Sequence, residues 1–186
     1  MLLYEELPRT VWVDGESYPI ITDFREWIKL IDLLKDKELG SNEKAILILQ
    51  WYSDEPPSNI KGAIEALSLF AQCKGHEDPQ EESENAPKET PVFSYSHDIN
   101  AILAGFQAIY GIDLLSIDYL HWWQFRALLD GLPEDTEFKR RVYYRSVNLA
   151  EIENAEERKR IAKIKRMIAL PDNELLTDED IGSAFW

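Results

Sequence analysis

One stretch near the middle of the chain, Lys74–Pro91, limits how the sequence can fold. It holds three prolines, six acidic residues and one other apolar residue, Ala86, in the order KGHEDPQEESENAPKETP. Such a segment cannot bury enough apolar surface to offset the entropy lost on ordering. The sequence therefore predicts a flexible acidic linker at 74–91 between an N-terminal unit at 1–73 and a C-terminal unit at 92–170, with an acidic tail at 171–186.

The N-terminal unit is expected to begin with a β-hairpin that is followed by three helices. Asp14-Gly15 has the chemistry of a tight turn and lies between two short β-prone runs. Thr22 or Asp23 then provides a helix cap, and the apolar residues that follow recur at the spacing of one helical face. Gly40 marks the end of this first helix.

The C-terminal unit is expected to consist of helices alone. Ser96 caps a helix that continues to Tyr110, and Gly111 stands where a left-handed residue ends such a helix. A second helix is expected to begin at Ser116 and to face the core through Trp123. Two more helices follow. The predicted fold class is mainly α, with two small helical units, an N-terminal β-hairpin and a flexible acidic linker.

The charge of the chain limits its partners. It has 20 basic and 35 acidic residues, and its net charge of −15 would repel nucleic acids and anionic membranes. No apolar run approaches the roughly 18 residues that a membrane-spanning helix needs. The acidic start MLLYEELPRT is unlike a signal peptide, and Cys73 has no second cysteine with which to form an internal disulfide. We expect a cytoplasmic protein that does not bind membranes.

The sequence lacks the motifs that would predict an enzyme. It contains no glycine-rich phosphate loop, nucleophile elbow or HExxH pair. Cys73 and His76 form a single C-x-x-H pair, which supplies too few ligands for a tetrahedral zinc site. His97-Asp98 is better explained by the first turn of a helix, where Asp98 complements the helix dipole. We expect no catalytic residue, no metal and no cofactor.

A cluster of large side chains at 121–125 is a candidate for partner binding. Successive helical positions point about 100° apart, so His121, Trp122 and Trp123 cannot all enter one core. One interpretation buries Trp123 and leaves His121 or Trp122 at the rim of the core. Another makes that rim an anchor for a second protein, because tryptophan is common in interface hot spots. The candidate partner-binding residues are His121, Trp122, Trp123 and Phe125.

A basic block interrupts the acidic chain late in the sequence. Residues 138–166 contain 10 basic and 4 acidic residues, a local charge of +6. The block is interpreted either as the solvated face of two helices or as a self-association surface that meets the acidic half of another copy. Nucleic-acid binding is a third option that the surrounding negative field disfavours. The residues singled out for self-association are Arg140, Arg141, Arg145, Lys163 and Arg166.

Several segments together resemble a known family. They are LPRTVWVDGESYPIITDFREWI (7–28), FSYSHDINAILAGFQAIYGIDL (93–114), LHWWQFRALLDGLPEDTEF (120–138), YYRSVNL (143–149) and KIKRMIAL (163–170). Their pattern is similar to that of the bacteriophage gene-product-fifteen family of tailed phages. The segments YGIDL and LHWWQFRALLDGLPEDT are the most distinctive, and the resemblance covers most of the chain.

The resemblance implies a phage or prophage protein that acts as a tail assembly chaperone. Such a protein binds the long tape-measure protein, and the tail-tube protein is a second expected partner. It works in the cytoplasm of the bacterial host, is absent from the mature virion and has no catalytic residue, metal or cofactor. A homo-oligomer is compatible with this role. The alternative function is an acidic DNA mimic that inhibits a host nucleic-acid-binding protein, which the net charge of −15 favours and the basic block disfavours.

Overall fold

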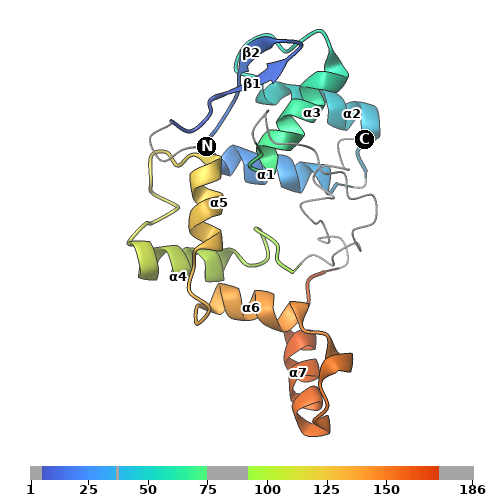
Figure 1. Ribbon diagram of the computed structural model, residues 1–186, viewed down its shortest axis with the longest axis vertical. Coiled ribbons are helices and arrows are strands. Elements are labelled where there is room, and N and C mark those ends of the chain that lie inside the picture. The colour runs from blue at the N-terminus through green and yellow to red at the C-terminus, as the bar shows by residue number, and fades with distance from the viewer. Residues whose placement is uncertain (1–5, 37, 75–91, 172–186) are drawn as a thin grey trace. The chain divides into compact units, whose positions relative to one another are not determined.

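The computed structural model describes residues 6–36, 38–74 and 92–171 (Figure 1). This part of the chain is mostly helical, with seven α-helices, two 3₁₀ helices and one two-stranded antiparallel sheet near the N-terminus. The predicted mainly α class with an N-terminal hairpin is confirmed. All but the first residue of the predicted linker, and all but the first residue of the predicted tail, lie outside the described residues.

The described residues form two compact units. The first contains the residues before 75 together with Tyr119–Arg126, and the second contains 92–118 and 127–171. The chain therefore passes from the first unit to the second inside helix α5 (Trp122–Asp130). The short segment Tyr119–Arg126 packs with the N-terminal residues, although its position in the sequence placed it in the C-terminal unit. The predicted boundaries around 74–91 stay predictions.

The first unit opens with the predicted hairpin. Strands β1 (Thr10–Val13) and β2 (Glu16–Pro19) pair antiparallel. The turn between them has φ of 52° at Asp14 and 83° at Gly15, so both turn residues have the positive φ that a tight hairpin favours. Alternate β1 side chains are buried, and Trp12 points to solvent between them.

Three helices complete the first unit. They are α1 (Phe24–Leu34), α2 (Ser41–Ile48) and α3 (Ile60–Ala71), with the 3₁₀ helix η1 (Leu49–Trp51) after α2. The side chain of Asp23 accepts the Arg25 amide and caps α1, which decides between the two caps that the sequence allowed. The core between these elements contains Trp27, Leu30, Ile31, Ile48, Leu67 and Phe70.

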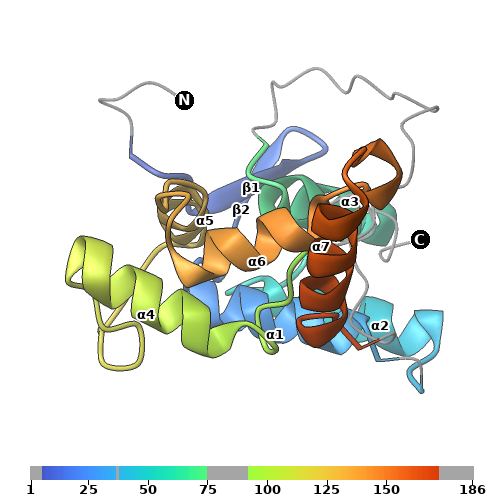
Figure 2. The same cartoon turned by 90° about the horizontal axis from the view of Figure 1, so that it is seen from below.

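The second unit contains α4 (Ile99–Tyr110), the last part of α5, α6 (Glu137–Ser146), the 3₁₀ helix η2 (Leu149–Glu151) and α7 (Ala155–Met167). Helix α6 packs against both α4 and α7 (Figure 2). Gly111 ends α4 with a φ of 67°, as predicted. Two predicted starts are wrong: α4 begins after Asp98 and not at Ser96, and α5 begins at Trp122 and not at Ser116.

Candidate functional site

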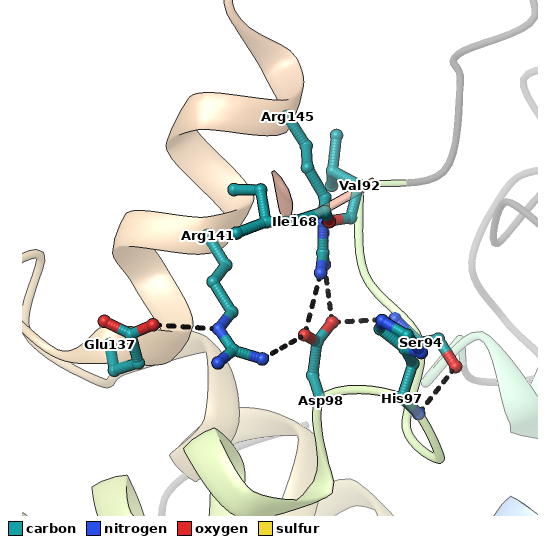
Figure 3. Close-up of polar contacts among 8 residues, drawn as sticks. All are labelled: Val92, Ser94, His97, Asp98, Glu137, Arg141, Arg145 and Ile168. Atoms are coloured by element: carbon teal, nitrogen blue, oxygen red, sulfur yellow. Dashed lines mark hydrogen bonds and ion pairs between the residues drawn. The ribbon is translucent and has the colours of Figure 1, made fainter. Parts of the chain in front are cut away.

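Asp98, directly before α4, is the centre of a buried ion-pair network in the second unit (Figure 3). Its side chain is 0% exposed. Arg145 of α6 donates from Nη1 to Oδ2 over 2.5 Å and from Nη2 to Oδ1 over 2.9 Å. Arg141 donates from Nη1 to Oδ1 over 3.2 Å, and the Ser94 amide donates to Oδ2 over 3.2 Å. Both carboxylate oxygens therefore accept two hydrogen bonds each from protein groups.

The sequence places both arginines on one face of α6 because they are four residues apart. Burial alone would raise the pKa of Asp98. The hydrogen bonds and charge of Arg145, the Ser94 amide and the hydrogen bond of Arg141 outweigh burial, so the pKa of Asp98 lies below its usual value. A hydrogen bond to Glu137, with a further one to Asp98, raises the pKa of Arg141. The Asp98 carboxylate and the Arg141 guanidinium are therefore both held in their charged forms.

Arg145 also joins the two ends of the second unit. Its Nε donates to the carbonyl of Ile168 over 2.6 Å, just after α7, and its Nη1 donates to the carbonyl of Val92 over 3.0 Å. With a side chain that is only 5% exposed, Arg145 has its guanidinium committed to Asp98 and these two carbonyls. The arrangement ties the two ends of the second unit to Asp98 through one buried guanidinium.

This network changes how the predicted charge patch is understood. Arg145 is buried, so its assignment to an exposed self-association patch is wrong. Arg141 is bound between Asp98 and Glu137. The remaining members of that set, Arg140, Lys163 and Arg166, are exposed, and their role in self-association stays a prediction. The sequence interpretation of Asp98 as a first-turn charge missed its arginine partners.

Two of the predicted partner-binding residues lie in the core of the first unit. Trp122 is 0% exposed, and its Nε1 donates to the carbonyl of Ala71 over 2.9 Å. Phe125 is 1% exposed and stacks on Phe24, with ring centroids 4.7 Å apart. In this structure these side chains hold the start of α5 against α1 and α3, and they offer no exposed surface to a partner.

His121 and Trp123 complete that set. His121 is 3% exposed; its Nδ1 accepts the Trp123 amide over 3.0 Å, so its Nε2 donates to the Pro8 carbonyl over 2.9 Å. Burial lowers the pKa of His121, which favours this neutral form. Trp123 is half-buried and donates from Nε1 to the Phe70 carbonyl. The expectation that Trp123 is the inner tryptophan and Trp122 or His121 the outer residue is wrong; partner binding by Trp123 stays a prediction.

Large apolar side chains that the described fold leaves exposed are better candidates for contact with a partner. They are Trp12, Ile46, Ile60 and Tyr119 in the first unit and Ile99, Ile109, Leu115, Tyr143 and Met167 in the second. Single exposed apolar residues are common on protein surfaces, so exposure alone does not define a site. A stronger candidate is a residue that a rigid backbone presents to solvent.

Leu115 meets this condition. It is 74% exposed and lies in a turn that polar contacts hold: Asp113 accepts the Leu115 amide at Oδ1 over 3.0 Å and the Ser116 hydroxyl at Oδ2 over 2.8 Å. The Ser116 hydroxyl, followed by the Leu115 amide, lowers the pKa of Asp113, so this carboxylate keeps its charge. Ile109, 44% exposed near the end of α4, precedes the turn. Sequence reasoning missed Leu115; the signal was Asp113 three residues before Ser116, the pattern of a side-chain-stabilised turn.

The described part of the chain gives no sign of two other kinds of site. No group of three or more histidine, cysteine, aspartate or glutamate side chains in it is arranged to hold a metal ion. No helix within the described ranges has both the length and the apolar character needed to cross a membrane. The candidates for contact with a partner are the exposed side chains of Ile109 and Leu115.

The fold and this surface define a mainly helical protein that is stabilised by an aromatic core in one unit and a buried ion-pair network in the other. A family model described as Bacteriophage Gp15 protein matches residues 3–170. The chain belongs to this family and is a phage protein, which confirms the resemblance found in the sequence. Comparison with curated proteins and with solved structures gives no match.

Proposed function

We propose that this protein is a tail assembly chaperone that binds the tape-measure protein while the phage tail is built. The family match over residues 3–170 carries this proposal, because the resemblance to the family implies that role. The protein acts without catalysis or a cofactor, in the cytoplasm of the host, and is not retained in the mature virion. The tail-tube protein is its second partner.

The proposed contact surface is the exposed pair Ile109 and Leu115. A long tape-measure helix with an apolar stripe aggregates unless the stripe is covered. Full burial of one leucine or isoleucine side chain contributes about 1.5–3 kcal/mol, and covering the fraction that is still exposed, 44% for Ile109 and 74% for Leu115, supplies a corresponding part of that value. Leu115 is mostly exposed and Ile109 partly exposed, so the exposed part of each is available for this contact.

Co-expression with the tape-measure protein of the same phage tests the proposal. The wild-type chain is expected to increase the soluble fraction of the tape-measure protein and to copurify with it. The variant I109Q/L115Q should lose this effect, because glutamine removes the apolar contact. The matched control is I46Q/I60Q, which makes the same chemical change at exposed positions of the first unit, 65% and 54% exposed. Circular dichroism checks that each variant is folded.

The possible outcomes distinguish the chaperone role of the protein from the assignment of Ile109 and Leu115 as its contact surface. An unchanged soluble fraction with the wild-type chain would contradict the chaperone role. If the wild-type chain solubilises the tape-measure protein and I109Q/L115Q does so equally well, the role stands and the assigned surface is wrong. An equal loss in I46Q/I60Q would show that the contact is not specific to Ile109 and Leu115.

A further inference from the structure

The outward face of α7 carries a row of exposed basic residues. Ile161 is buried on the opposite side of the helix, while Lys159, Lys163 and Arg166 are exposed at spacings of four and three residues. These spacings place the three cations on one helical face, which we name the basic face of α7. Packing of α7 against α6 through its other side leaves this face uncovered by the second unit.

The charges of the basic face are only weakly compensated. Lys159 contacts Glu156 over 3.1 Å, but both side chains are largely exposed, and such pairs contribute little. Arg166 donates to the carbonyl of Ala162 in its own helix, which carries no net charge. Lys163 makes no ion pair with any residue that the structure describes. The face is thus open to carboxylates from another molecule.

The rest of the chain has the complementary charge. Outside residues 138–166 it contains 31 acidic and 10 basic residues. Screening at physiological salt limits electrostatic attraction to about 8 Å, so an approaching molecule is affected by the local positive face more than by the net charge of the whole chain. Of the charged residues outside 138–166, 19 acidic and 8 basic residues lie in the part of the chain that the structure describes, so a second copy of the chain supplies the carboxylates that the basic face requires.

We infer that the basic face of α7 binds the acidic surface of a second copy of this chain. The contact joins two different surfaces of the chain, so two copies can exchange it reciprocally about a two-fold axis, or successive copies can repeat it head to tail in a ring or an open chain. This inference goes beyond the proposed function and does not depend on it, because self-association requires no tape-measure protein. The proposed function and this inference can fail separately. The solubility of the tape-measure protein tests the proposed function, and the mass of the isolated chain tests self-association.

Sedimentation velocity of the full chain over a range of concentrations tests the inference. At about 0.15 M salt, where the Debye length is about 8 Å, the chain is expected to form species larger than a monomer, and at about 0.5 M salt these should dissociate, since salt screens the contact. The variant K159Q/K163Q/R166Q should weaken self-association by about tenfold or more, because it removes three charge-assisted contacts. Glutamine is compatible with a helix, and circular dichroism confirms that α7 is retained.

The matched control removes the same number of positive charges from the first unit, at exposed positions. It is the variant K29Q/K61Q/K74Q, which should self-associate as well as the wild-type chain or better. The inference is overturned by a monomer at every concentration at about 0.15 M salt, by self-association that higher salt does not weaken, or by an equal loss in both variants. A contact within one chain would also overturn the inference. In that case the wild-type chain would be a monomer whose radius increases with salt, because salt releases an acidic segment of the same chain from α7. The variant K159Q/K163Q/R166Q would not show this increase.

Discussion

Substitution of Asp98 by asparagine tests the buried network of the second unit. Asparagine keeps the size of the side chain but removes the charge that compensates Arg145, whose side chain is 5% exposed. The guanidinium cannot lose its proton, so it stays buried and charged without a carboxylate to compensate it, although the Ile168 and Val92 carbonyls still accept its hydrogen bonds. Removal of one member of a buried ion pair costs about 3–5 kcal/mol. For a chain of this size the melting temperature should fall by roughly 6–20 °C.

Thermal and urea unfolding followed by circular dichroism measure this loss. The control is Glu137→Gln, which removes a carboxylate bound to Arg141 of the same network, but one whose side chain is 55% exposed. Its cost should be less than about 1 kcal/mol. A D98N variant that loses less than about 1 kcal/mol, or no more than E137Q, would refute the view that the network stabilises the second unit.

The same variant also changes the response to acid. Folding lowers the pKa of Asp98, so its contribution to stability is present above the unfolded value of about 3.9 and is lost as pH falls from there through the folded-state pKa. The wild-type chain should lose stability in this range, and D98N should lack the part of the loss that Asp98 causes. Equal acid dependence in both proteins would contradict the assignment of this titration to Asp98.

Two further predictions concern the first unit, which contains all five described tryptophans, so that their fluorescence reports on its unfolding. Burial lowers the pKa of His121, so stability should be complete above about pH 6.5 and should decrease as pH falls from there toward the folded-state pKa. H121N should abolish this dependence and the exposed-site control H97N should keep it; a slope that survives H121N would contradict the assignment. Trp122→Ala should cost about 3–5 kcal/mol in urea unfolding, whereas Trp12→Ala, at a site 49% exposed, should cost less than about 1 kcal/mol, and equal costs would contradict the observed burial.

The parts of the fold that local chemistry decides could be predicted from the sequence. Asp14-Gly15 specifies the hairpin because both residues tolerate positive φ. Asp23 caps α1 because its side chain reaches the amide two residues later. Gly111 ends α4 because a left-handed residue is required there. Each of these signals lies within a few residues of the feature that it controls.

Features that depend on distant residues could not be predicted. Asp98 meets Arg141 and Arg145, 43 and 47 residues later in the sequence, and no local pattern indicates that pairing. Trp122 is the inner tryptophan because its indole donates to a carbonyl 51 residues earlier. The sequence spacing shows only that Trp122 and Trp123 point in different directions. Which of them is buried is decided by where α3 lies.

The exposed pair Ile109 and Leu115 was missed for a related reason. Periodicity assigns Ile109 to the apolar stripe of its helix, and it does not show that the core ends before that residue, at Phe106, which is 0% exposed. The expected helix start at Ser116 concealed the turn that presents Leu115. Exposure of an apolar residue depends on what the rest of the chain leaves uncovered, so a candidate interaction surface requires the three-dimensional structure.

The most direct test of the proposed function is whether the purified full chain forms a complex with the tape-measure protein of the same phage. After co-expression, the two proteins are expected to elute together from a size-exclusion column. The I109Q/L115Q variant should elute alone, with the tape-measure protein found in the pellet. A tape-measure protein that aggregates to the same extent with and without the wild-type chain would contradict the proposed role.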